Sequence, residues 1–128
     1  MFEPHCQYSI DIQGAVMVTI LSGAWNREGA KKYAEDVKTA AENLVHKPWC
    51  RIADLSDFDG GPMEVMDELI ELQQWSRSNK CVRLLLVAPK LLNKSVIDSK
   101  APVYPDVDQL ATLDEAIQRA NELLIPPK

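Results

Sequence analysis

A short, almost uninterrupted apolar run at residues 82–88, with the sequence VRLLLVA, most constrains how this chain can fold. Strands that are covered on both faces show this pattern, and surface strands and surface helices do not. A second short apolar run, residues 50–55, is also typical of a buried strand. Strands of this kind need helices on both faces of their sheet, so the two runs predict an α/β fold.

The N-terminal part alternates apolar and polar residues over 8–12 and again over 16–20, with Gln13-Gly14 between the two segments. This pattern predicts a β-hairpin that turns at Gln13-Gly14. Apolar residues then recur at helical spacing from Asn26, a typical N-cap residue, to Leu44. We therefore expect the first long helix at residues 26–44.

Two more helices follow from their start signals. Pro62 is suited to the first turn of a helix whose apolar face continues through Leu72. Near the C-terminus, residues 109–111 predict a short edge strand, and residues 112–115, TLDE, form a capping box that opens a last helix. Between residues 89 and 107 the pattern is irregular, and we expect a loop that is mobile or ordered by a partner.

The chain of 128 residues fits one domain, with a core over about residues 7–125. Its three cysteines are widely spaced and odd in number, which argues against a disulfide framework and a zinc site and favours the cytoplasm. We expect no cofactor, and no run is long enough to span a membrane. The net charge of -5 opposes nucleic acid as a partner.

These elements give the order ββαβαβ(α)βα, and the chain resembles a STAS domain of the SpoIIAA-like fold. That group includes anti-sigma-factor antagonists and the cytoplasmic tails of sulfate transporters. Three segments carry the resemblance, namely LSGAWN, RIADLSDF and QLATLDEAIQRANELL. The resemblance implies one α/β domain over residues 1–128, with a mixed sheet of four to five strands, an N-terminal hairpin and three to four helices.

In the antagonists that this chain resembles, the turn after the third strand carries an Asp-Ser-Ser-Gly motif whose serine a partner kinase phosphorylates. The corresponding residues here are 57–62, DFDGGP, which contain no hydroxyl group. Ser56 is the nearest hydroxyl, but we expect it at the end of the strand and not in the turn. The chain is therefore expected either to have lost the phosphorylation switch or to present fixed negative charge already, through Asp57 and Asp59.

The turn and the helix after it are the best candidate site. Residues 54–71 hold seven carboxylates and no basic residue, whereas residues 77–100 hold six basic residues and one acidic residue. We predict a non-enzymatic regulatory or scaffolding module that binds a protein partner, and the acidic charge suits a basic one. The predicted binding residues are Ser56, Asp57, Asp59, Gly60, Gly61, Met63, Glu64 and Trp75. The alternative for the charges is an ordinary solvated helix face.

Three other interpretations stay open. A homodimer could pair the acidic helix of one copy with the basic region of the other. Leucines in the segment KLLNKSVI could border a cleft for a lipid or another small apolar ligand, so that the chain would be a carrier. Asp57 and Asp59 also match, superficially, the nucleophile motif of a metal-dependent phosphatase, although the chain is short for that fold.

Overall fold

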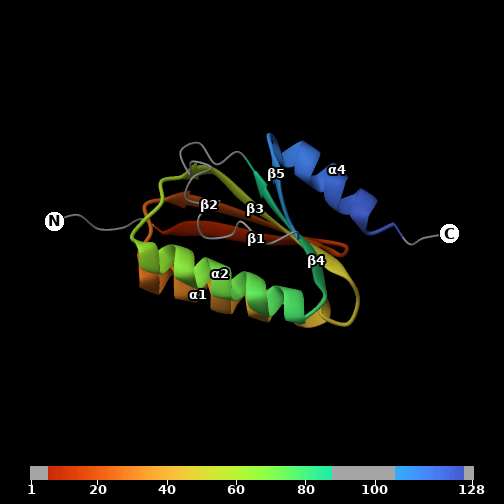
Figure 1. The fold of residues 1–128 in the computed structure, drawn as a ribbon, viewed down its shortest axis with the longest axis horizontal. Helices are drawn as coiled ribbons and strands as arrows, with labels where there is room; N and C mark the ends of the chain where they lie inside the picture. The colour runs from red at the N-terminus through yellow and green to blue at the C-terminus, as the bar shows by residue number, and fades with distance from the viewer. Residues whose placement is uncertain (1–5, 88–105, 126–128) are drawn as a thin grey trace.

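The computed structural model describes residues 6–87 and 106–125, and it contains one five-stranded mixed sheet (Figure 1). The strands lie in the order of the sequence, β1-β2-β3-β4-β5. The first pair, β1 and β2, is antiparallel, and every later pair is parallel. The strands are β1 (Gln7–Gln13), β2 (Val16–Gly23), β3 (Trp49–Phe58), β4 (Cys81–Val87) and β5 (Val107–Leu110).

Helices cover both faces of this sheet (Figure 1). On one face α1 (Arg27–Ala40), which continues into the short 3-10 helix η1 (Ala41–Asn43), packs beside α2 (Met63–Ser78). On the other face lies α4 (Leu113–Leu123). Each face has its own cluster of buried apolar side chains, the larger one under α1 and α2. The α/β architecture expected from the two buried strands is confirmed.

Most of the predicted elements are confirmed together with their start signals. The hairpin turns at Gly14, which has a φ of 64°. The side chain of Asn26 caps α1 by accepting a hydrogen bond from the Gly29 amide at 2.8 Å. The Thr112 hydroxyl caps α4 by accepting from the Glu115 amide at 3.2 Å. These polar caps satisfy amides that a helix start leaves without a partner.

Strand β4 shows why its sequence is apolar almost throughout. It lies between β3 and β5. Leu84 belongs to the cluster under α1 and α2, and Leu85 belongs to the cluster under α4. Successive side chains of a strand point to opposite faces, so both faces of β4 meet a core.

The end of β3 differs from the prediction. The strand was expected over residues 50–55 with Ser56 at its end, but β3 continues to Phe58. The pairing with β2 passes from Ile20–Asp54 to Ser22–Asp57, so β3 advances three residues where β2 advances two. This extra residue is a β-bulge, which lets the ladder continue through a polar segment. The prediction was wrong because polar residues were read as the end of the strand.

The loop expected at residues 89–107 lies, except for its last two residues, outside the described residues. Within the part of the chain that the structure describes, no helix is long and apolar enough to cross a membrane.

Candidate functional site

Residues 57–64, here called the acidic turn, connect the end of β3 to the start of α2. Two backbone hydrogen bonds tie this segment to the end of β2 and to the loop that follows it. The Asp59 amide donates to the Gly23 carbonyl at 2.9 Å, and the Trp25 amide donates to the Gly60 carbonyl at 2.8 Å. Gly60 has a φ of 83°, a conformation that glycine adopts without a steric cost. The turn is therefore held in one conformation by its own backbone.

Gly61 is packed so closely that no side chain fits there. A Cβ atom at this position would lie 2.3 Å from the Trp25 carbonyl oxygen and 3.0 Å from a methyl group of Val65. The Trp25 backbone has little room to move, because its indole is 2% exposed and donates a hydrogen bond to the Ser22 carbonyl at 2.8 Å. Its ring also packs against Phe58, at 5.7 Å between centroids. Packing therefore excludes a side chain at residue 61, whereas a Cβ atom at Gly60 would meet nothing within 4 Å.

The outer surface of the acidic turn is open and negatively charged. Asp57, Asp59 and Glu64 are exposed, and Met63 is 57% exposed. Beside them lies a hollow of about 290 Å³, lined by Phe58, Asp59, Gly60, Gly61, Met63, Val65 and Met66. Glu64 lies in the first turn of α2, where a carboxylate interacts favourably with the helix dipole. The arrangement combines charged groups with an apolar recess.

Comparison with known proteins gives a consistent answer for the fold. No family model and no curated protein matches the sequence. The anti-sigma factor antagonist SpoIIAA in its unphosphorylated form matches with a TM-score of 0.71 and 15% identity, over 93% of this chain and 100% of that chain. An anti-sigma factor antagonist from Mycobacterium paratuberculosis matches with a TM-score of 0.66 and 13% identity, over 91% and 95% of the two chains.

A third structure carries the name of the fold itself. It is an uncharacterized DUF3478-family protein with a SpoIIAA-like fold from Shewanella loihica PV-4, with a TM-score of 0.68 and 10% identity over 94% and 97% of the two chains. The chain has the SpoIIAA-like fold. The predicted fold, including the N-terminal hairpin, is thereby confirmed, while identities this low leave function to be argued from the site.

Two of the predicted site residues do not belong to the acidic turn of this SpoIIAA-like domain: Ser56 directly precedes it, and Trp75 lies further along α2. The Ser56 hydroxyl donates to an Asp54 carboxylate oxygen at 2.6 Å, and the Ser56 amide donates to the same oxygen at 3.0 Å. Trp75 follows Met63 by three helical turns, a rise of about 18 Å along the axis of α2. It lies in the groove between α1 and α2, with the Lys38 ammonium group 5.7 Å from the ring centroid. The structure therefore does not bring Met63 and Trp75 into one apolar contact.

The acidic face of α2 is also less uniform than its spacing suggests. By its helical spacing Glu68 should share an exposed face with Glu64, Asp67 and Glu71. Its side chain is only 14% exposed and pairs with Arg27 of α1 at 3.3 Å. Glu64, Asp67 and Glu71 are exposed. The carboxylates that a partner could reach thus concentrate at the start of α2 and in the turn before it.

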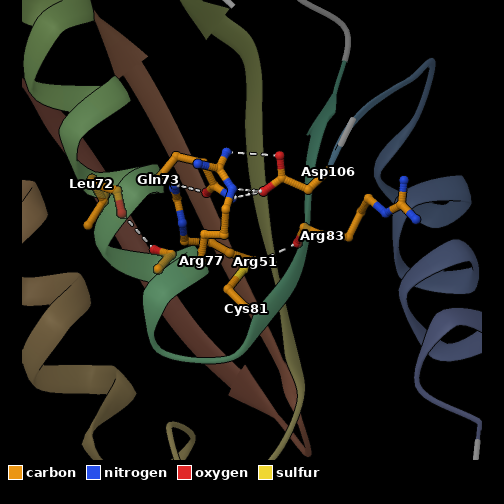
Figure 2. A network of polar contacts seen from close by, with 8 residues as sticks. Arg51, Leu72, Gln73, Arg77, Cys81, Arg83 and Asp106 are labelled. Carbon is orange, nitrogen blue, oxygen red and sulfur yellow. Dashed lines mark hydrogen bonds and ion pairs between the residues drawn. The ribbon is translucent and has the colours of Figure 1, made fainter. Parts of the chain in front are cut away.

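A buried cation beneath α2 was missed in the sequence. Arg51 of β3 is 2% exposed, and its guanidinium group donates to the Tyr33 hydroxyl at 3.1 Å and to the Gln73 amide oxygen at 2.9 Å. Gln73 in turn donates to Asp106 at 3.1 Å, and Arg77 binds Asp106 with two hydrogen bonds of 2.8 and 2.9 Å (Figure 2). A single arginine within the apolar run of residues 50–55 was the only signal of this network.

The network sets the ionisation of Asp106. Burial alone would raise the pKa of this carboxyl group, but hydrogen bonds from Arg77 and Gln73 and the charge of Arg77 lower the pKa below its ordinary value of 3.8. Asp106 is thus an anion over the physiological pH range and shares a hydrogen-bonded chain with the Arg51 guanidinium group. The network joins β3, α2 and the residue before β5, so its role is structural: it holds these elements together.

The described cysteines and acidic groups give no sign of a metal centre. Cys6 is half-buried, and Cys50 and Cys81 are buried free thiols. Burial, and secondly the neighbouring Cys81, raise the pKa of Cys50 to about 12, and burial raises the pKa of Cys81. Among residues 6–87 and 106–125, no three His, Cys, Asp or Glu side chains are grouped to hold a metal ion. The leucines of KLLNKSVI lie outside these ranges.

Proposed function

We propose that this chain is a non-catalytic regulatory or scaffolding module that binds a basic protein segment through the acidic turn. The observation that carries the proposal is the rigid display of exposed carboxylates around an apolar recess. Asp57, Asp59 and Glu64 supply the charge, and Met63 borders the recess. Lysine or arginine side chains of a partner would meet the carboxylates, while one apolar side chain would enter the recess.

The fold supports the same proposal. Two of the structurally similar proteins are anti-sigma factor antagonists, which are regulatory proteins. The antagonists that the chain resembles carry a phosphorylatable serine in the turn after the third strand, whereas residues 57–62 of this chain contain no hydroxyl group. Negative charge at this turn comes from the side chains of Asp57 and Asp59 and needs no modification to supply it. Binding through the acidic turn would therefore not depend on a kinase.

The test uses a variant that loses negative charge at the acidic turn but keeps its fold. Partners are captured from a lysate of the source cell with the wild-type chain, identified by crosslinking at the turn, and then titrated in purified form. Replacing both aspartates (Asp57→Asn with Asp59→Asn) is expected to weaken binding roughly tenfold, because two interfacial charge pairs are lost. The thermal midpoint should stay nearly unchanged, since both side chains are exposed.

A matched control removes the same charge from another surface. Glu35 and Glu42 are exposed on α1 and η1, and their double replacement by glutamine should leave binding unchanged. Equal binding by the Asp57/Asp59 variant and the wild type would refute the proposal.

Two further measurements address the alternative functions. A lipid mass retained in native mass spectrometry would favour the carrier, and calorimetric binding of Mg²⁺ would favour the phosphatase.

A further inference from the structure

The two edge strands of the sheet are not equally protected against pairing with another chain. A free edge strand can pair with another chain, and natural proteins shorten, charge, bulge or interrupt such strands. At one edge, β5 has only four residues, and its Asp108 forms ion pairs with Arg83 at 3.3 Å and with Arg119 at 3.4 Å. At the other edge β1 has seven residues and, among the described strands, a neighbour on one side only.

Strand β1 has almost none of the usual protective features. Its sequence, QYSIDIQ, contains no proline, glycine or lysine, and Asp11 is its one charged residue. Its pairing with β2 continues without a bulge from Gln7–Ser22 to Gln13–Val16. Ile12 is 41% exposed, although it belongs to the face that α1 covers. The outer edge of β1 is therefore regular, extended and partly apolar.

We propose that two copies of this chain pair through β1 in an antiparallel arrangement, with Ile10 of each copy on the two-fold axis. An isologous contact requires a strand whose sequence complements itself in reverse. Around Ile10, β1 meets this requirement: Gln7 faces Gln13, Tyr8 faces Ile12, and Ser9 faces Asp11. Apolar residues meet apolar residues on the α1 face, and polar residues meet polar residues on the other. The result is one continuous sheet through both copies.

Neighbouring registers fit less well. Placing Asp11 on the axis would set the two Asp11 carboxylates directly opposite each other, which is destabilising. Placing Ser9 on the axis would leave the exposed Ile12 without an apolar partner within β1. A shift by one residue would set Ile10 opposite Asp11. Only the Ile10 register covers Ile12 with an aromatic ring, that of Tyr8, and aromatic pairs with β-branched residues stabilise antiparallel strands.

The proposal is independent of the acidic turn and commits to a specific pairing, so charge substitutions in β1 test it. The full chain is studied by sedimentation velocity from about 1 μM to about 1 mM, where an interface of this small size would saturate. The wild type should shift from monomer to dimer. Ser9→Asp opposes two aspartates at two symmetric places and should weaken the dimer about tenfold.

The opposite substitution and a double variant fix the register. Ser9→Lys should tighten the dimer about tenfold, and Ser9→Asp combined with Asp11→Lys should restore it. Both positions are exposed, so each variant should keep the wild-type thermal midpoint. Gln118→Glu, on the exposed side of α4, adds a negative charge elsewhere and should leave the dimer unchanged. A chain that stays monomeric at about 1 mM, or a dimer that does not respond to the Ser9 substitutions, overturns the proposal.

Discussion

Replacing Gly61 by alanine tests whether packing excludes a side chain at this one position of the acidic turn. The new Cβ atom would lie 2.3 Å from the Trp25 carbonyl oxygen, and ordinary contacts begin at about 3.4 Å, so one of the two backbones must move by about 1 Å. The Trp25 side resists this movement, because its amide is bonded to Gly60 and its indole is buried. We expect Gly61→Ala to shift the turn and lose the Trp25–Gly60 hydrogen bond.

The loss of stability expected for Gly61→Ala can be estimated from these contacts. Overpacking of this kind costs about 1–3 kcal/mol, and a lost backbone hydrogen bond costs about 1 kcal/mol. The smaller entropy of the unfolded alanine chain offsets about 0.4–1 kcal/mol. The free energy of unfolding should therefore fall by about 2 kcal/mol, which lowers the melting temperature of a domain of this size by about 8 °C. Gly61→Ser should cost at least as much, since it adds the same Cβ atom.

Urea unfolding followed by tryptophan fluorescence measures this difference, and two other glycines serve as controls. Gly60 and Gly14 have φ values of 83° and 64°, but a Cβ atom at either would meet nothing within 4 Å. Alanine at these positions should cost roughly 1 kcal/mol each through backbone conformation alone. If Gly61→Ala is no more destabilising than Gly60→Ala, steric exclusion at the turn is refuted.

Two further predictions concern buried groups. A thiol reagent at pH 8 should label Cys6 rapidly in the folded chain and reach Cys50 and Cys81 only on unfolding, since burial raises the pKa of both; fast labelling of all three would contradict this. Asp106→Asn should lower stability by roughly 1 kcal/mol at pH 7. Because the folded pKa of Asp106 is depressed, this stability is fully present above pH 3.8 and is lost as the pH falls further, so the gap between the two chains should close in acid. A gap that urea titrations show to be independent of pH would contradict the assigned ion pair.

The elements that the sequence predicts well are those whose signals are local. The apolar run of β4, the Asn26 and Thr112 caps and the turn at Gly14 each depend on residues adjacent in sequence. The bulge in β3 has no such signal, because it depends on how the strand pairs with β2 near Ser22. Strand ends within polar segments are therefore less predictable than helix starts.

The candidate site also has some features with a local sequence signal and others that depend on contacts between distant segments. Exposed acidic residues in a glycine turn can be found in the sequence, but the contact between Gly61 and the Trp25 carbonyl joins segments 36 residues apart. Arg51 is similar, since its partners Tyr33 and Gln73 come from two different helices. By helical spacing Trp75, four residues after Glu71, falls on the acidic side of α2, but this spacing could not show that Lys38 of α1 lies over its ring. Contacts between distant segments decide which side chains are available to a partner.

The register of the sheet links the acidic turn to the proposed dimer. Gln7, Ser22 and Asp57 lie side by side on β1, β2 and β3, so the turn is at the same end of the sheet as the start of β1. A two-fold axis through Ile10 therefore places the two turns at opposite ends of the continuous sheet. Strand spacings of about 4.8 Å and a rise of about 3.3 Å per residue put the turns about 30 Å apart. A dimer of this kind presents two separate acidic sites to a partner with two basic segments, and its combined affinity depends on whether the partner spans that distance.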